Sequence, residues 1–445
     1  MKAAVPAAGR RGDWLRAFAV YGDRRVLIIF FMGFASGLPL LLTLSTLSYW
    51  LAKVGVDKTS IGLFALVGLP YSIKFLWAPI IDQVRIPGLA RLFGHRRSWA
   101  LVIQAALIVA ILVMGTSDPA VAPWTTAAAA LAVAFFSASQ DIVIDAYRIE
   151  ILTDEEQGVG AASTQFGYRL GLLVAGAGAM SLSDFVGWFW VFAAMAALVL
   201  VGTVTVLLAP EPQRPAETPA DRPASARAWF NKAALAPLAD FVQRRGWAVI
   251  LLFALLYKFG DAIGGVMANP FYVELGFTGL EIGSISKVMG AVATMLGIFV
   301  GGAMVARYGI LWALVVGGIL QAATNLLFAV QAVVGHDLGM LAVTIGADNF
   351  TGGLGSAAFV AYLSSLCNHA FTGTQYALLT SLMAFGRTVL SSGGGWLADQ
   401  VDWVTFFILT TGLAIPGLLL LAWLMRLYPP PLRRPNLIGR VPAGR

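Results

Sequence analysis

Nine ionisable side chains interrupt long apolar stretches of this sequence. They are Lys74, Asp141, Asp145, Arg169, Lys258, Asp261, Lys287, Asp348 and Arg387. A charged group inside a lipid bilayer costs ~2.5 kcal/mol or more, so such groups normally face a partner or a water-filled cavity. Five of the nine are basic and four are acidic. This balance weakly favours an acidic or zwitterionic solute.

Asp141 and Asp145 are four residues apart, which places both carboxylates on one face of a helix. Two carboxylates this close in a low dielectric cannot both ionise cheaply, so one of them is expected to accept a proton unless a cation lies nearby. Arg148 and Arg169 are the candidate cations. Asp141 and Asp145 are both candidates for proton coupling; for Asp141 we favour that role, and for Asp145 the alternative of a structural ion pair near the helix end. The adjacent Gln140 is a candidate for binding substrate.

Lys258 and Asp261 are three residues apart in a later apolar stretch. In the functional interpretation, Lys258 binds a carboxylate of the solute, while Asp261 tunes that lysine or takes part in proton coupling. The alternative is a self-neutralising pair within one helix. Further candidates for binding substrate are polar or aromatic residues at similar depth: Lys74, Arg169, Tyr257, Lys287, Asp348, Asn349 and Arg387. Structural alternatives remain for three of them. The ammonium groups of Lys74 and Lys287 could extend to the membrane interface, and the ring of Tyr257 could pack against neighbouring helices.

The composition places these residues in a membrane protein. Of the 445 residues, 58% are hydrophobic and only 12% are charged, and the mean hydropathy is +0.79. Soluble enzymes and nucleic-acid-binding proteins need more surface charge, about 25% in an average soluble domain. The single cysteine, Cys367, and three histidines leave too few ligands for a disulfide framework or a metal centre. We therefore expect no metal and no cofactor, and the sequence lacks a nucleotide-binding loop.

Twelve apolar segments are long enough to cross a bilayer. They span residues 26–48, 60–81, 99–116, 122–147, 158–181, 186–208, 247–270, 281–305, 310–334, 339–366, 374–397 and 403–427. Most lysines and arginines outside these segments fall on the side that holds both termini, whereas the opposite side carries only Lys53 and Lys58. The positive-inside rule then predicts that both termini are cytoplasmic.

A polar, proline-rich stretch divides the twelve segments into two sets of six. We predict a cytoplasmic N-terminal segment, a six-helix bundle, a cytoplasmic linker, a second six-helix bundle and a cytoplasmic tail, at residues 1–25, 26–208, 209–246, 247–427 and 428–445. The halves also match weakly, because a shift of 221 residues aligns VGVDKTSIG (54–62) with LGFTGLEIG (275–283). Two parallel six-helix repeats predict an all-helical, major-facilitator fold.

A coarse motif for holding helices together lies between the second and third segments. Asp82 lies at the end of the second segment, and Arg96 and Arg97 lie at the start of the third. In major-facilitator proteins, acidic and basic residues at this place fasten helices on the cytoplasmic side, so the three residues form a candidate cytoplasmic latch. The alternative is that the two arginines only supply positive charge to the cytoplasmic loop.

Several strings resemble the AmpG-type muropeptide permeases. They are GFASGLPLLL (33–42), KFLWAPIIDQ (74–83), SASQDIVIDAYRIEIL (137–152), GYRLGLL (167–173), LLYKFGDA (255–262) and TQYALLTSL (374–382). This resemblance implies proton-driven import of GlcNAc-1,6-anhydro-MurNAc peptides from periplasm to cytoplasm, by alternating access, in peptidoglycan recycling and β-lactamase induction. It also implies a multi-pass protein of the bacterial inner membrane.

The partners expected are therefore a muropeptide, protons and the lipid bilayer, with no nucleic acid, and a monomer is expected to suffice. The wider family also includes acetyl-CoA transporters, so an importer of another anion is one alternative. A drug/proton antiporter is a second. An integral-membrane enzyme is disfavoured because no clustered nucleophile, base or metal site is evident.

Overall fold

The computed structural model describes residues 20–56, 64–153, 156–213, 225, 231, 235–391 and 394–428. The secondary structure in these residues is helical throughout. The first half contains α2 (Arg24–Thr43), α3 (Ser45–Lys53), α5 (Leu69–Ile73), α6 (Ala78–Gln83), α7 (Leu89–Phe93), α8 (His95–Thr116), α9 (Pro123–Ile151), α10 (Gln157–Leu173), α11 (Ala179–Leu182) and α12 (Trp188–Leu208).

The second half begins inside the predicted linker 209–246, of which the structure describes residues 209–213, 225, 231 and 235–246. It contains α14 (Ala236–Val242), α15 (Trp247–Leu256), α16 (Phe259–Glu274), α17 (Gly279–Ile282), α18 (Gly290–Tyr308), α19 (Ile310–Val334), α20 (Leu338–Ser365), α21 (Thr372–Ser391), α22 (Gly394–Gln400), α23 (Trp403–Gly412) and α24 (Ile415–Leu427). A seven-residue π-helical stretch, η7 (Gly283–Met289), joins α17 to α18.

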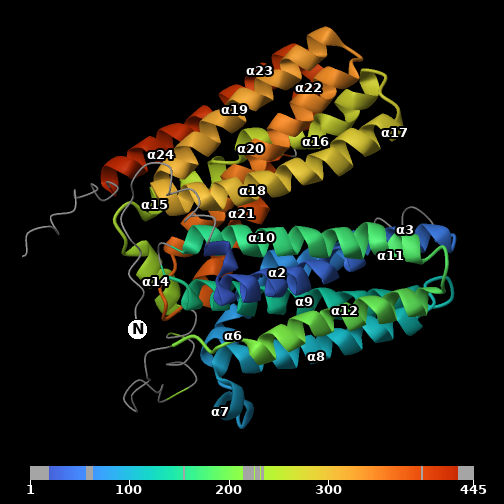
Figure 1. The fold of residues 1–445 in the computed structure, drawn as a ribbon, viewed down its shortest axis with the longest axis vertical. Coiled ribbons are helices and arrows are strands. Elements are labelled where there is room, and N and C mark those ends of the chain that lie inside the picture. Colours follow the sequence, from blue (N-terminus) through green and yellow to red (C-terminus); the bar gives the residue numbers. More distant parts are fainter. Residues whose placement is uncertain are drawn as a thin grey trace, which may run out of the picture.

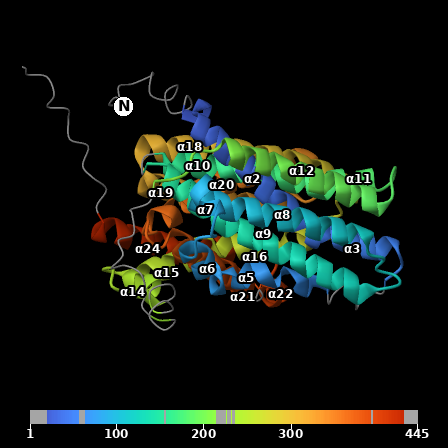
Figure 2. The same ribbon diagram turned by 90° about the horizontal axis from the view of Figure 1, so that it is seen from below.

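The two halves form two stacked groups of helices (Figure 1), and the view from below shows that most of the long helices run in nearly the same direction (Figure 2). We call α2–α12 the N-terminal bundle and α15–α24 the C-terminal bundle. α10 of the first packs against α18 and α20 of the second. Small residues permit this close approach: a Cβ added to Gly302 in α18 would lie 2.5 Å from the Cβ of Ala162 in α10. In Figure 1 the bundles converge at the end near α14 and diverge toward α3 and α17.

Eight helical stretches among the described residues are both long and apolar enough to cross a membrane, against the twelve predicted. Helices also occupy the other four predicted segments, 60–81, 158–181, 339–366 and 374–397, but they are interrupted or richer in glycine and polar residues. α10, for example, packs against α2, α18 and α20 at once. A helix enclosed by other helices exposes less surface to lipid, so it needs fewer apolar residues.

The second predicted segment is not one continuous helix. After residues 57–63, which lie outside the described residues, the chain forms η2 (Ala65–Gly68), α5, η3 (Lys74–Leu76) and α6. Pro70 and Pro79 each occupy the first turn of a new helical piece. Proline removes a backbone donor and clashes with the preceding turn, so it starts a helix readily but interrupts one in progress. Lys74 lies at the junction between two pieces.

The seventh predicted segment is also interrupted, next to the candidate residue Lys258. α15 ends at Leu256, and α16 begins at Phe259. Lys258 precedes the first turn of α16 with φ −106° and ψ 15°, outside helical geometry. Lys258 is therefore not inside one regular helix, as the sequence suggested, but at a break between two.

The weak internal repeat has a structural counterpart in its glycines. Gly55 and Gly276, which the sequence shift aligns, have φ values of 82° and 83°. Gly94 and Gly309, which precede α8 and α19, have φ values of 87° and 85°. Side chains other than glycine rarely adopt such positive values. The two halves therefore turn in the same way at corresponding connections.

Candidate functional site

A buried ion pair joins two helices of the N-terminal bundle. Lys74 Nζ in η3 lies 3.8 Å from Asp141 Oδ2 in α9, and the two side chains are 9% and 13% exposed. The hydroxyl of Ser36 in α2 donates a hydrogen bond to Asp141 Oδ1. Three helical segments therefore converge on one carboxylate. The sequence had suggested arginines as partners for this carboxylate, whereas the cation beside it is Lys74.

Asp145 pairs with Arg148 within the same helix, with 3.6 Å between Oδ1 and Nη2. Arg148 also reaches the other bundle: its Nη1 donates to Ser364 Oγ in α20 at 2.9 Å, and its guanidinium lies 5.4 Å from the ring centre of Tyr376 in α21. Gln140 donates to the carbonyl of Ala35 in α2 at 2.9 Å. Arg148 therefore links the bundles, and Gln140 fastens α9 to α2.

Lys258 lies in a ring of oxygen atoms in the C-terminal bundle. Its Nζ donates to Gln321 Oε1 in α19 at 3.2 Å, to the Gly352 carbonyl at 3.3 Å and to Ser356 Oγ in α20 at 3.2 Å. Asp261 Oδ2 lies 3.9 Å away. The helix break before α16 lets this lysine meet two other helices at once. Gln321 and Ser356 were not among the candidates predicted from the sequence, because both are uncharged residues within apolar stretches.

A cavity of about 180 Å³ adjoins this lysine site. Its polar lining residues are Asp261, Tyr272, Ser286, Asn325, Asp348 and Asn349. The Thr324 hydroxyl donates to Asp348 Oδ1 at 3.5 Å, and Asn349 Oδ1 accepts from Thr294 at 3.0 Å. No group of three or more His, Cys, Asp or Glu suited to a metal ion occurs in the described part of the chain.

The other candidates for binding substrate lie in different surroundings. Tyr257 is 7% exposed, its hydroxyl donates to the Leu314 carbonyl at 2.8 Å, and its ring stacks on Phe359, so it packs inside the C-terminal bundle. Arg169 has an exposed side chain on α10. The side chains of Lys287 and Arg387 lie outside the described residues.

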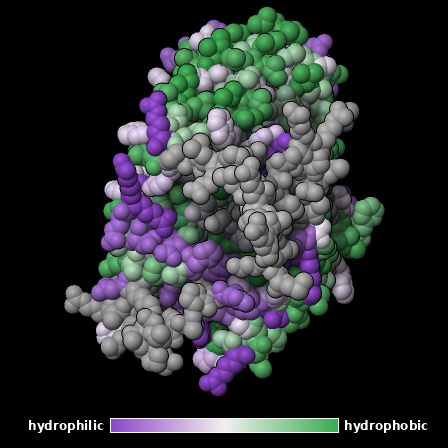
Figure 3. All heavy atoms as spheres, turned by 60° about the vertical axis from the view of Figure 1, so that its left-hand side comes forward, coloured by the Kyte–Doolittle hydropathy of each residue, from purple (hydrophilic) through white to green (hydrophobic). Residues whose placement is uncertain are grey.

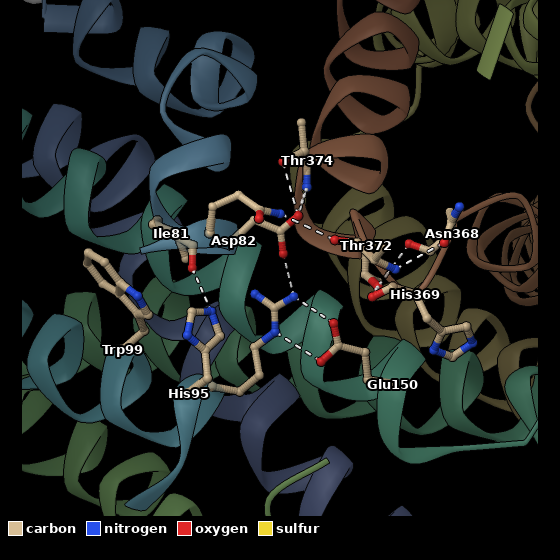
Figure 4. A network of polar contacts seen from close by, with 12 residues as sticks. Ile81, Asp82, His95, Trp99, Glu150, Asn368, His369, Thr372 and Thr374 are labelled. Carbon is tan, nitrogen blue, oxygen red and sulfur yellow. Dashed lines mark hydrogen bonds and ion pairs between the residues drawn. The ribbon is translucent and has the colours of Figure 1, made fainter. Parts of the chain in front are cut away.

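A second polar network ties the bundles together at the end where they converge. Arg96 Nη2 in α8 lies 2.5 Å from Asp82 Oδ1 and 2.6 Å from Glu150 Oε1, and Arg96 is fully buried. Asp82 Oδ2 accepts hydrogen bonds from the backbone N–H and the hydroxyl of Thr374, both at 3.1 Å. Figure 4 shows Asp82 beside Thr374, with Glu150 in the same network. Thr374 lies in the first turn of α21, where a negative charge interacts favourably with the helix dipole.

Arg97, the third residue of the predicted latch, makes different contacts. Its side chain donates to the carbonyls of Val206 and Leu207 at the end of α12, at 2.9 and 2.8 Å. Its backbone N–H and that of Arg96 donate to the carboxylate of Glu211, which therefore caps the N-terminus of α8. Burial raises the pKa of Glu211, while these backbone hydrogen bonds oppose the shift. Arg97 therefore fastens helices within one bundle.

The fold and the sequence both have known relatives. The family model described as Major Facilitator Superfamily matches residues 26–293 and 250–444. The chain is 40% identical over 404 residues to the anhydromuropeptide permease of Escherichia coli K12, covering 90% of this chain and 80% of that protein. It is 34% identical over 412 residues to a putative transporter, AmpG 4, of Rickettsia conorii, covering 92% and 99%.

Solved structures show the same fold at low sequence identity. The fucose:proton symporter of Escherichia coli superposes with a TM-score of 0.66 at 13% identity, covering 92% of this chain and 99% of that one. A bacterial homologue of the iron transporter ferroportin gives 0.65 at 15% identity, covering 90% and 98%. The predicted fold class is thus confirmed. The chain belongs to the Major Facilitator Superfamily of membrane transporters and, within it, to the family of AmpG-type permeases.

Proposed function

We propose that this protein imports anhydromuropeptides into the bacterial cytoplasm, driven by the proton gradient. The observation that carries this proposal is the 40% identity to the Escherichia coli anhydromuropeptide permease across 90% of the chain. Binding would occur between the two bundles, and alternate opening at the two ends would move the solute.

We assign the converging end, with Arg96, to the cytoplasm and place the protein in the inner membrane. Lysine and arginine are concentrated in the connections at this end, as the positive-inside rule requires. Hydrophilic side chains also gather on this end of the molecule (Figure 3). The contacts of Asp82 with Thr374 and of Arg148 with Ser364 would then hold the cytoplasmic side closed. The conformation described is accordingly open toward the periplasm.

Asp141 is the residue that we propose carries the coupled proton. As an ion pair, Asp141 and Lys74 neutralise each other in a buried place. Protonation of Asp141 would leave the Lys74 ammonium without its counter-charge, and an uncompensated buried cation is strongly unfavourable. A carboxylate of the arriving peptide can restore neutrality. Proton binding and solute binding would therefore favour each other.

Lys258 is the proposed second contact for the solute. Its three hydrogen-bonding oxygens belong to neutral groups, and Asp261 is farther away at 3.9 Å. An incoming carboxylate can form a charge-assisted hydrogen bond that is stronger than those to neutral acceptors. The two lysines lie in different bundles, so one solute bound to both would draw the bundles together.

Uptake into proteoliposomes tests this function. We expect a labelled anhydromuropeptide to accumulate when the outside is acidic, and an uncoupler to abolish accumulation. Acetyl-CoA and a cationic drug should not be transported under the same gradient. Accumulation that survives the uncoupler would remove proton coupling, and transport of acetyl-CoA in place of the muropeptide would favour the other anion importer.

The closed end can be tested with the single cysteine, Cys367, which is buried beside α21. Asp82→Asn weakens the acceptor for both Arg96 and Thr374, so we expect faster labelling of Cys367 by a maleimide. Asp337→Asn, an equivalent change at the start of α20 on the opposite end, should leave the labelling rate unchanged. Equal rates in all three proteins would contradict the assignment of Asp82 to a gate.

A further inference from the structure

The cavity in the C-terminal bundle contains a carboxylate, Asp348, to which the proposed transport mechanism gives no role. It lies between α16, η7, α19 and α20, and we call it the Asp348 cavity after the carboxylate of α20 that lines it. Asp348 takes part in no ion pair in the described part of the chain, and its side chain has one hydrogen bond, from Thr324 at a long 3.5 Å. By contrast, Asp141 and Asp145 each have a cation within 4 Å.

Among the described side chains, no charged group forms an ion pair with Asp348. Lys258 is held by Gln321, Gly352 and Ser356 and lies 3.9 Å from Asp261. Asp261, on α16, lines the same cavity and adds a second negative charge. Tyr272 is the other titratable group in the lining. Lys287, on η7, follows the lining residue Ser286, and its own side chain lies outside the described residues.

A second, independent observation is the side chain of Asn325 on α19. It is only 4% exposed and lines the cavity, yet its amide Nδ2 has no hydrogen-bond partner among the described residues. A buried polar group left unpaired costs ~1–3 kcal/mol. The amide oxygen and nitrogen can exchange places by rotation, so Asn325 can present either a donor or an acceptor to the contents of the cavity.

We propose that the Asp348 cavity is a binding site for one monovalent cation, either a sodium ion or a proton. The side chains that line it offer carboxylate, amide, hydroxyl and phenol oxygens, the atoms that hard cations prefer. Two acidic residues rather than three argue against a divalent metal ion. A volume of about 180 Å³ exceeds that of one water molecule, so the ion can keep part of its hydration shell. Such a water would also satisfy Asn325.

This site is separate from the proposed proton carrier. Asp141 belongs to the N-terminal bundle, whereas Asp348 and Asp261 belong to the C-terminal bundle. A cation at Asp348 would offset the negative charge beside Lys258 and leave that lysine free to attract a carboxylate. Occupancy of the cavity would thereby increase the affinity of the Lys258 site for an acidic solute.

Equilibrium dialysis of the purified full-length protein against radioactive sodium ions tests the proposal without any solute, so its result does not depend on the proposed function. We expect one saturable site per chain that Asp348→Asn abolishes and Asn325→Ala weakens several-fold. Asp402→Asn is the matched control, because Asp402 is an exposed residue of the same bundle that caps α23. This variant should bind sodium normally. Thermal melting of each variant separates loss of the site from loss of the fold.

Infrared difference spectra between acidic and alkaline samples test whether the site binds a proton. If sodium does not bind, a carboxylic-acid band that disappears in Asp348→Asn but persists in Asp402→Asn assigns the site to a proton. If folded Asp348→Asn matches the unmodified protein in both sodium binding and the infrared spectrum, the proposal is overturned. Should Asp348→Asn fail to fold, unaltered sodium binding and spectra in Asn325→Ala would overturn it equally.

Discussion

The two bundles each bury a lysine beside an aspartate, but they surround the pair differently. Lys74 and Asp141 lie in the N-terminal bundle with side chains 9% and 13% exposed. Lys258 and Asp261 lie in the C-terminal bundle, are both 23% exposed, and border a cavity with a second carboxylate. In the first bundle each buried aspartate has its own cation within 4 Å. In the second, Asp348 has none among the described residues.

This difference suits the two sites to two tasks, proton coupling in the N-terminal bundle and exchange of binding partners in the C-terminal bundle. In a dry site, the charge of one partner depends on the charge of the other, because an unpaired buried charge is strongly unfavourable. Such a pair is suited to linking proton binding to solute binding. In a wetter site with several neutral oxygen acceptors, each charge is partly solvated by its surroundings. Lys258 can then exchange partners without disturbing the fold.

The largest expected effect follows from Asp141→Asn. This change removes the proton acceptor and leaves Lys74 buried without a counter-charge, so coupled uptake should be abolished. Breaking a buried pair by removing one partner costs ~3–5 kcal/mol, so a lower melting temperature should accompany the loss. Proteoliposome uptake and melting in detergent measure the two effects. Normal accumulation in the variant would remove Asp141 from the mechanism.

The double variant Lys74→Met with Asp141→Asn is the control for this interpretation. Removing both charges leaves no unpaired ion, so the double variant should melt at a higher temperature than Asp141→Asn alone. Uptake should remain absent. A double variant no more stable than the single one would mean that the two residues do not act as a pair.

Lys258→Ala should reduce affinity selectively. We expect binding of a carboxylate-bearing anhydromuropeptide to weaken about tenfold, equivalent to ~1.4 kcal/mol. Binding of the disaccharide without peptide should change much less, because it lacks the carboxylates that the lysine would meet. Competition binding with both ligands measures the ratio. Equal losses for the two would assign Lys258 a structural role.

Asp261→Asn should destabilise the protein less than Asp141→Asn does. Lys258 retains its hydrogen bonds to Gln321, Gly352 and Ser356 when Asp261 becomes neutral. A partly exposed ion pair is worth only about 1 kcal/mol. Melting temperatures compared side by side provide the test. If the two variants were equally destabilised, the contrast between a dry and a wetter site would be wrong.

Only a partial loss of uptake is expected for Ser36→Ala, which removes the hydroxyl that donates to Asp141. Lys74 remains beside the carboxylate, so the lost hydrogen bond should cost ~1–3 kcal/mol at most, and uptake should fall only partly. Uptake rates at several substrate concentrations measure this change. Complete loss of uptake would show that Ser36, rather than the ion pair alone, controls Asp141.

The fold was largely predictable from the sequence, whereas the partners of the charged residues were not. Apolar segments of membrane-spanning length predict the helices, because in lipid the backbone must satisfy its own hydrogen bonds. The positions of Asp141 and Lys258 in such segments already mark them as functional candidates. Pro70 and Pro79 are visible in the sequence, but the interruption they cause before and after Lys74 appears only in the structure.

The order of amino acids is enough to identify a helical membrane protein with two related halves and with ionisable groups in the membrane segments of both. Which of these groups meet is visible only in the folded chain: Lys74 with Asp141, Arg96 with Asp82 and Glu150, and Lys258 with oxygens from α19 and α20. The physical reason is that hydrophobicity fixes the length of a helix. Its breaks and its rotation about its own axis, which decide the direction of each charged side chain, depend on the helices packed around it.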